Sequence, residues 1–383
     1  MGCIANICRG NEEQIQSITR KGGVYILKQA LNNVQEKCRV EAILALGNIA
    51  GDNFILRDLI LKEGVLPLIL ANMEKSTSFS ILNSSTWCLA NICRSEPKLS
   101  MEYFTQIIKP LAEVIKNNDD QKLLLNSTWT LYYLSETKKE KIDLIIKSGV
   151  IPRLIGLLKH ELKRVSIPCL RVLGTISAGA DEQTQVIINA GIIPVLKELI
   201  LSDNQSLKKE SFWVLSNIAG GTEAQLEVLI ANDVITLAIK AINKYTYEIK
   251  LEALWLLLNA TQTMPARYVD YMLTTEIIEA LMQFLHSSEA KALLLTLQAI
   301  ENMLRKAKEV YGDRNNIKKK IEESGCVHII EGLQYHANED VYELANEIIE
   351  EYLVVENIED VLGSITMASI TNGTEGTISM FNF

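Results

Sequence analysis

The chain has 383 residues, of which 22% are charged and 48% apolar, and its formal net charge is −9. Glycine and proline are scarce, at 20 and 7 residues, so the composition excludes a disordered, collagen-like or low-complexity protein. Because a single core is strained at this length, we expect two or three domains or one elongated repeat array. The acidic balance argues against nucleic acid or an anionic membrane as the main partner and suits a basic ligand.

Several classes of site have no signature in the sequence. No apolar run reaches the roughly 18 residues of a membrane span, and residues 1–10 lack the pattern of a signal peptide. The seven cysteines form no CxxC pair, which indicates reduced thiols, most of them in the core. The four histidines show no metal-binding spacing, and no Ser/His/Asp arrangement or phosphate loop occurs. We therefore expect a cytosolic or nuclear protein that is not an enzyme and holds no metal or cofactor.

Two residue types recur along the chain with a period of about 42 residues. The tryptophans are separated by 42, 84 and 42 residues and share one phase: Trp87, Trp129, Trp213 and Trp255. Six units carry an asparagine four residues after the position of the tryptophan: Asn6, Asn48, Asn91, Asn217, Asn259 and Asn302. In the two remaining units Tyr133 and Thr175 take the asparagine position, and Arg171 takes the tryptophan position before Thr175. A fixed period of this length predicts a repeat architecture.

Several units also contain a Gly-x-x-Pro motif or part of one. The complete motifs are Gly64 to Pro67, Gly149 to Pro152 and Gly191 to Pro194, whereas Pro110 has no such glycine before it. Glycine commonly ends a helix, and proline is favoured in a first helical turn. A unit is therefore predicted to contain a short helix, a break at glycine, a second helix begun near proline, and a third helix with the tryptophan and asparagine.

Three helices in 42 residues fit the armadillo repeat, and we predict an all-α, right-handed superhelical solenoid whose third helices line a concave face. The array is expected to span residues 1–355, with a truncated first unit and a final pair of helices from Asn316 to Leu353. Residues 356–383 are acidic and then rich in Ser, Thr, Gly and Asn, which predicts a disordered tail.

The third-helix sequences resemble those of importin α (karyopherin α). Residues 44–52 read LALGNIAGD and are similar to the family's WALGNIAGD, and residues 86–94 read TWCLANICR and are similar to TWTLSNLCRG. Residues 129–135, WTLYYLS, resemble WAISYLSDG. The resemblance covers nearly the whole array. It implies a nuclear import adaptor that binds Lys/Arg-rich nuclear localisation signals in the concave groove.

The resemblance further implies two peptide-binding sites. The major site would consist of Asn6, Gly10, Asn48, Asp52, Trp87, Asn91 and Trp129. The minor site would consist of Asp181, Thr184, Glu210, Trp213, Ser216, Asn217, Glu252, Trp255 and Asn259. Asparagine amides can pair with the backbone of an extended peptide, and tryptophan rings can hold the stems of its Lys and Arg side chains. Asp52, Glu210 and Glu252 would take the charged heads.

Some positions depart from the family's pattern. Leu44 replaces a groove tryptophan, Gly2 stands where another would be, and Asn126 replaces an acid. Ile15 replaces a threonine, and Thr175 replaces an asparagine. Most of these changes lie near the major site, so we expect the minor site to bind more tightly.

The expected partners also follow from the resemblance. Cargo peptides would bind in the groove, and the family's export receptor would bind the C-terminal repeats. The basic segment that binds importin β has no counterpart before Asn6, so we do not expect recruitment of importin β in the usual way. Two alternatives remain open: another kind of armadillo-repeat interaction scaffold, or a truncated importin-α paralogue that binds signals without coupling to importin β.

Overall fold

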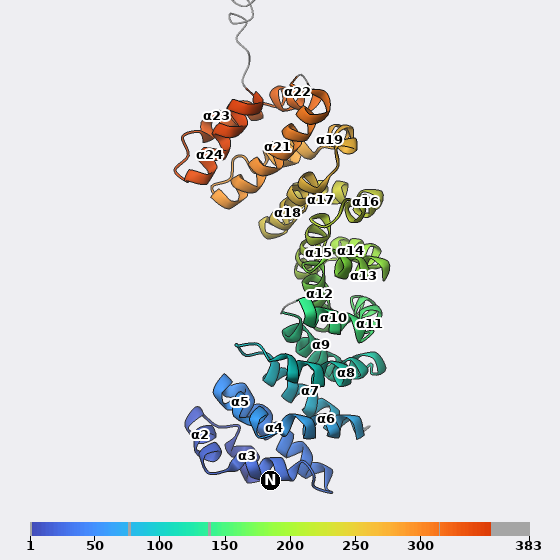
Figure 1. Cartoon of the computed structure of the whole chain (residues 1–383), viewed down its shortest axis with the longest axis vertical. Coiled ribbons are helices and arrows are strands. Elements are labelled where there is room, and N and C mark those ends of the chain that lie inside the picture. The colour runs from blue at the N-terminus through green and yellow to red at the C-terminus, as the bar shows by residue number, and fades with distance from the viewer. Residues whose placement is uncertain (1, 76–77, 137–138, 314, 354–383) are drawn as a thin grey trace, which may run out of the picture. The chain divides into compact units, whose positions relative to one another are not determined.

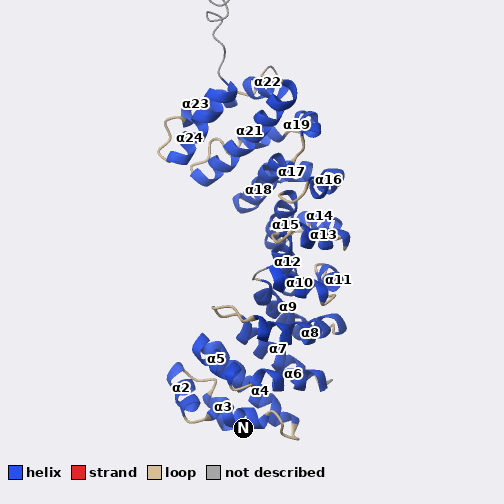
Figure 2. Cartoon of the chain, in the orientation of Figure 1, coloured by secondary structure: helices blue, strands red, loops and turns tan. Residues whose placement is uncertain are grey.

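The computed structural model describes residues 2–75, 78–136, 139–313 and 315–353, and every regular element in these ranges is helical (Figures 1 and 2). The predicted all-α class is therefore confirmed. The helices form two compact units, Met1–Pro265 and Ala266–Phe383. The predicted tail, residues 356–383, lies outside the described residues.

The first unit is organised around a series of third helices, each of which contacts the next in chain order. They are α1 (Gly2–Ile7), α4 (Glu36–Asp52), α7 (Phe79–Cys93), α9 (Gln121–Ser135), α12 (Lys163–Ser177), α15 (Gln205–Ala219) and α18 (Tyr247–Thr263). All four tryptophans and the first five asparagines of the 42-residue phase lie on these helices. The period therefore located the third helices correctly.

Shorter helices precede most third helices. The first helices are α2 (Glu12–Arg20), α5 (Phe54–Lys62), α10 (Lys139–Lys147), α13 (Asp181–Asn189) and α16 (Glu223–Ala231). The second helices are α3 (Gly23–Ala30), α6 (Val65–Lys75), α11 (Ile151–Leu157), α14 (Ile192–Leu201) and α17 (Val234–Lys244). The predicted breaks lie at glycines with φ of 70°, 72° and 83°: Gly64, Gly149 and Gly191. Glycine adopts this left-handed conformation without the steric penalty of a Cβ atom.

One repeat departs from this plan. Helix α8 (Met101–Asn117) runs without a break through Pro110, and it replaces the two short helices that the other repeats have. No glycine stands three residues before Pro110, so nothing at that position favours the left-handed turn. Proline alone does not end this helix. The breaks of the other repeats lie at a residue with positive φ, which is glycine or, between α16 and α17, Asp233 with φ of 57°.

Polar side chains link repeats in addition to the apolar core. The Nε2 atom of Gln183 donates to the carbonyl oxygen of Lys139 at 3.0 Å, and Gln225 donates to that of Asp181 at 2.8 Å. Arg57 is only 2% exposed, and it donates to two carbonyl oxygens in the segment that leads into α8. Each of these contacts joins segments about one repeat apart and so holds the register of the stack.

The second unit is built around one long helix. Helix α21 (Ala290–Tyr311) carries Asn302 and contacts α20, α22 and α24. The other elements are η1 (Ala266–Tyr268), α19 (Val269–Thr274), α20 (Ile277–Met282), α22 (Asn316–Glu323), α23 (Cys326–Leu333), α24 (Glu339–Ile348) and a π-helical turn η2 (Ile349–Leu353). The predicted final pair of helices from Asn316 to Leu353 was wrong, because this stretch forms three helices and the π-helical turn.

Among the described residues, no single helix combines the length and apolar character needed to cross a membrane, and only the bent pair α13 and α14 meets that test jointly. Five of the cysteines are buried, as expected for core thiols: Cys8, Cys88, Cys93, Cys169 and Cys326.

Candidate functional site

Two tryptophans of the third helices, Trp87 and Trp213, pack against a glycine of the preceding third helix. A Cβ atom built on Gly47 would lie 2.6 Å from Trp87 Cζ3, and one built on Gly174 would lie 2.0 Å from Trp213 Cζ3. All four tryptophans are nevertheless half-buried and not fully enclosed. The glycines therefore let the rings lie close to the backbone, and part of each ring stays accessible. We call these tryptophans, with the asparagines of the same phase, the ladder.

Two ladder asparagines connect adjacent third helices. Asn217 Nδ2 donates to the carbonyl oxygen of Gly174 at 3.3 Å, and Asn259 Nδ2 donates to that of Ser216 at 2.8 Å. Asn91 Nδ2 instead donates to Trp87 within its own helix, at 3.3 Å. Within the described ranges, the Oδ1 atoms of Asn217 and Asn259 accept no hydrogen bond. These amide oxygens remain available to a ligand, although the amide groups also join repeats.

Arginines lie beside the ladder at positions that were not predicted as site residues. Arg9 Nη1 donates to Asn6 Oδ1 at 3.4 Å, and Arg94 Nη2 donates to the carbonyl oxygen of Gly51 at 2.6 Å. Both arginines follow a ladder asparagine by three residues, and this spacing on one helix face could have identified them. They place positive charge next to the predicted major site.

A third arginine occupies the middle of the third-helix series. The Arg171 guanidinium lies 5.9 Å from the ring centre of Trp129 and 5.6 Å from that of Tyr132. Its Nη2 atom is also 2.9 Å from Glu210 Oε1. Arg171 therefore makes the contacts with a tryptophan and a carboxylate that were expected of a ligand's cation.

A second network borders this arginine. The Tyr132 hydroxyl donates to Glu136 at 2.6 Å, and Lys98 Nζ lies 3.0 Å from the same carboxylate. Burial and the Glu136 carboxylate raise the pKa of Tyr132 to about 12. Burial raises the pKa of Glu136, but the hydrogen bonds from Tyr132 and Lys98 outweigh it, so this pKa lies below its usual value. Glu136 is therefore anionic at neutral pH.

A pocket of about 530 Å³ opens at this place. The residues that line it lie on α9, α12, α15 and α18, or directly after α9 and α12. They are Tyr132, Glu136, Arg171, Thr175, Ala178, Lys209, Glu210, Trp213 and Glu252. Three residues of the predicted minor site, Glu210, Trp213 and Glu252, therefore meet at one pocket. Trp255, Asn217 and Asn259 are half-buried on the same helices, α15 and α18, and do not line it.

Two other predicted minor-site residues are enclosed by the fold. Thr184 is 2% exposed and donates to the carbonyl oxygens of Ser177 and Ala180. Ser216 is 3% exposed and donates to Trp213 at 2.9 Å. Asp181 is exposed, but it begins the first helix α13 and does not lie on a third helix. Because Thr184 is buried, its side chain is not placed to contact a ligand directly.

The predicted major-site residues are spread over α1, α4, α7 and α9. Asn6 and Gly10 are exposed, and Asn48 and Asp52 are half-buried. Asp52 Oδ2 accepts a hydrogen bond from Asn53 at 2.8 Å. The pocket that includes Trp213 contains none of the predicted major-site residues.

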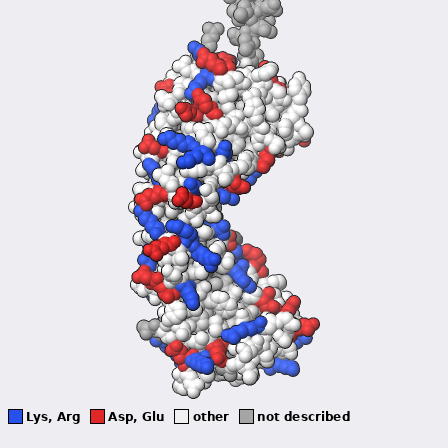
Figure 3. All heavy atoms as spheres, turned by 180° about the vertical axis from the view of Figure 1, so that it is seen from behind, with Lys and Arg blue, Asp and Glu red and all other residues white. Residues whose placement is uncertain are grey.

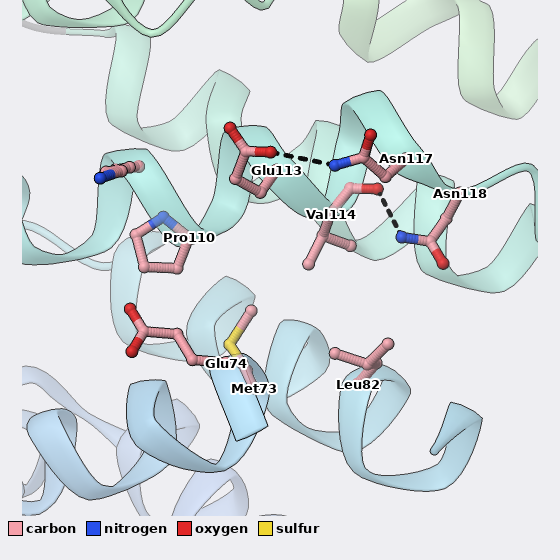
Figure 4. Close-up of a pocket in the computed structure, with 9 residues that line it drawn as sticks. Met73, Glu74, Leu82, Pro110, Glu113, Val114, Asn117 and Asn118 are labelled. Atoms are coloured by element: carbon pink, nitrogen blue, oxygen red, sulfur yellow. Dashed lines mark hydrogen bonds between the residues drawn. The ribbon is translucent and has the colours of Figure 1, made fainter. Parts of the chain in front are cut away.

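A different hollow of about 320 Å³ lies between α6, α7 and α8 (Figure 4). Met73 and Leu82 form apolar parts of its wall, and Glu113 accepts a hydrogen bond from Asn117 at 3.0 Å. It contains no predicted site residue. Basic and acidic side chains are interspersed on the face of the molecule shown in Figure 3. In the part of the chain that the structure describes, no group of three His, Cys, Asp or Glu residues is placed to hold a metal ion.

Comparison with known families identifies the repeats. The armadillo/beta-catenin-like repeat matches residues 56–94, 138–178 and 180–220, and the atypical Arm repeat matches residues 315–366. An engineered protein of known structure superposes with a TM-score of 0.74 at 20% identity, covering 91% of this chain and 92% of its own. The matched segments of this chain are armadillo repeats. The fold of the chain is the predicted all-α armadillo solenoid.

Similarity to importin α is partial. This armadillo-repeat protein is 36% identical over 178 residues to importin subunit alpha-1b of Oryza sativa subsp. japonica, which is 46% of this chain and 33% of the relative. It is 35% identical over 178 residues to importin subunit alpha-3 of Arabidopsis thaliana, with the same coverage. The matched part spans about one third of the length of these relatives. A designed armadillo repeat protein in complex with the peptide (KR)4 superposes with a TM-score of 0.57 at 20% identity, covering 62% of this chain and 99% of its own.

Proposed function

We propose that this armadillo-repeat protein binds an extended Lys/Arg-rich peptide along its third helices and acts as a nuclear import adaptor for proteins that carry such peptides. The observation that carries the proposal is the pocket in which Trp213 is accompanied by Glu210 and Glu252. An aromatic ring and two carboxylates in one pocket suit a long side chain with an apolar stem and a cationic head.

The asparagines support an extended backbone in the ligand. An extended peptide has an unpaired N–H and C=O at each residue, and these groups need partners when the peptide is bound. The free Oδ1 atoms of Asn217 and Asn259 lie on adjacent third helices and can each accept from such an N–H. Repetition by 42 residues then places equivalent contacts along the ligand.

The relatives bear on the biological setting. Similarity to importin α subunits supports cargo peptides as partners and movement between cytoplasm and nucleus. The fold likeness to a designed armadillo protein bound to (KR)4 is compatible with a basic ligand. Binding of an export receptor by the C-terminal repeats is part of the same proposal.

Charge selectivity provides the test of the proposed function. A fluorescein-labelled peptide with a run of lysines would be titrated with the full chain, and fluorescence anisotropy would give the affinity. The control peptide has glutamates in place of the lysines. We expect the lysine peptide alone to bind, and its affinity to fall as salt rises from about 0.05 to 0.5 M, because ion pairs in a partly open groove are screened. Preference for the glutamate peptide, or no binding of either, would overturn the proposal.

One observation favours a second candidate, a scaffold for acidic peptides. Arg9, Arg94 and Arg171 all lie on or beside the third helices, and their guanidinium groups can bind carboxylates in a bidentate geometry. Arg171 is already paired with Glu210, which reduces its positive field. The glutamate peptide in the same titration tests this candidate directly.

A further inference from the structure

Two lysines and a helix N-terminus meet at the Tyr245 ring, on the edge of the stack formed by α14, α15, α17 and α18. We propose that Lys208 and Lys244 bind the phosphate group of a phosphorylated serine or threonine in a partner protein at this place. The site uses no ladder residue, so it goes beyond the proposed function and does not depend on it.

The two lysines converge on one aromatic ring. Lys208 lies on the third helix α15, and its Nζ atom is 4.2 Å from the ring centre of Tyr245. Lys244 ends α17, and its Nζ atom is 5.7 Å from the same ring centre. The Tyr245 hydroxyl donates to the carbonyl oxygen of Ile200 at 3.3 Å, which holds the ring against α14. Two like charges therefore share one fixed ring.

Neither ammonium group is neutralised by the protein. Lys208 is only 6% exposed, yet within the described ranges its ammonium makes no ion pair or hydrogen bond, and the same holds for the exposed Lys244. Asp203 and Glu248 are exposed acids of the adjoining segments, and neither pairs with these lysines in the described structure. An ammonium group has three N–H donors, and a ring face attracts the charge without accepting all of them. A buried charge with unused donors is costly unless an anion supplies acceptors.

The N-terminus of α18 adds positive potential beside the ring. Thr246 directly follows Tyr245 and is the N-cap residue of α18, but its side chain caps no backbone N–H group. The first N–H groups of a helix have no partners within it, and the helix dipole places partial positive charge there. Residues 240–250 also contain three lysines and one glutamate. A phosphate group carries about −1.5 to −2 charges and three acceptor oxygens, so it can bind both ammonium groups beside this terminus.

Apolar side chains around the ring favour a peptide over a free phosphate ion. Leu201 at the end of α14 is 69% exposed, and Tyr247 in the first turn of α18 is 38% exposed. Leu201 follows Ile200, whose carbonyl oxygen accepts from Tyr245, and Tyr247 follows Tyr245 by two residues. Both side chains therefore flank the ring. They offer contacts to apolar residues next to a phosphorylated side chain, which an inorganic phosphate ion lacks.

The test uses a fluorescein-labelled peptide with one phosphoserine between leucines and no Lys or Arg, so that it does not address the ladder. Anisotropy with the full chain should show that this peptide binds at least about tenfold more tightly than its unphosphorylated form. Lys244→Gln should weaken this binding roughly three- to tenfold. The matched control is Lys147→Gln, because Lys147 is an exposed lysine that likewise ends a helix, α10, and this variant should stay within about twofold of the unmodified chain.

A third variant removes the buried charge. Lys208→Met keeps most of the apolar stem, so it should weaken binding at least as much as Lys244→Gln. Circular dichroism melting checks that Lys208→Met folds, and the exposed Lys244 keeps the test decisive if it does not. Equal binding of the phosphorylated and unphosphorylated peptides, or equal affinities of Lys244→Gln and Lys147→Gln, would overturn the site.

Competition separates the two sources of phosphate. Inorganic phosphate should displace the labelled peptide only at concentrations far above the Kd of the peptide. Displacement at concentrations close to that Kd would mean that the site takes a free ion, which overturns the assignment to a peptide. The lysine peptide should bind Lys244→Gln as it binds the unmodified chain, so failure of the lysine peptide to bind would count against the proposed function alone.

Discussion

Individual side chains of the chain itself occupy positions that a ligand would need. Arg171 lies over Trp129 and Tyr132 and pairs with Glu210, so one cation contact of the groove is satisfied internally. A bound basic peptide would meet both a like charge and a carboxylate that is already neutralised. Arg171 should therefore weaken binding of a basic ligand at the central pocket.

Replacing Arg171 tests this interpretation. Arg171→Gln removes the positive charge and frees Glu210, so the affinity for the lysine peptide should rise about threefold, in line with the modest energy of a partly exposed ion pair. Arg164→Gln is the matched control, because Arg164 is an exposed arginine of the same helix, α12. A fall in affinity for Arg171→Gln that the control does not show would mean that Arg171 supports the groove.

At the scale of helices, the contact between α12 and α15 depends on one glycine. A Cβ atom at position 174 would overlap the Trp213 ring, with 2.0 Å to Cζ3. Gly174→Ala should therefore displace that ring and lower the free energy of unfolding by about 1–3 kcal/mol, as overpacking does in a close-packed contact. Binding of the lysine peptide should weaken as well, since Trp213 is part of the pocket.

The control for this prediction is Gly156→Ala on α11. A Cβ atom there would meet no atom within 4 Å, so the change should raise stability by about 0.5–1 kcal/mol through helix propensity. Urea unfolding of both variants measures the difference. Equal stability of the two variants would show that Trp213 does not pack on Gly174 as described.

The sequence determines the helices better than the contacts between them. The 42-residue period placed the third helices, and the glycine of each Gly-x-x-Pro motif located a break. The continuous helix α8 could have been anticipated only by giving the absent glycine before Pro110 more weight than the proline. In contrast, the burial of Thr184 depends on how α13 packs, and a family motif does not carry that information.

For the site as well, the sequence pattern predicts which residues take part, but not the contacts that depend on how the helices pack. Glu210, Trp213 and Glu252 were predicted, and the structure brings them to one pocket. The partnership of Arg171 with Glu210 joins residues 39 positions apart, and it follows from the stacking of α12 on α15.

For the molecule as a whole, the ladder is proposed to be a single repeated surface that binds an extended basic peptide. Ladder residues that share a phase should contribute to one binding event, and residues of similar chemistry outside the phase should not. This claim concerns the first unit, in which all four tryptophans lie. Tyr335 in the second unit is a suitable comparison, since this aromatic side chain is 90% exposed and lies outside the phase.

The most direct measurement is the affinity of the lysine peptide for the double variant Trp213→Ala, Trp255→Ala, beside Tyr335→Ala. Two ring contacts of about 0.5–2 kcal/mol each would be lost, so the double variant should bind roughly ten- to a hundredfold more weakly. Tyr335→Ala should bind like the unmodified chain. An unchanged affinity of a folded double variant would contradict the claim that the tryptophan–asparagine ladder is the peptide-binding surface.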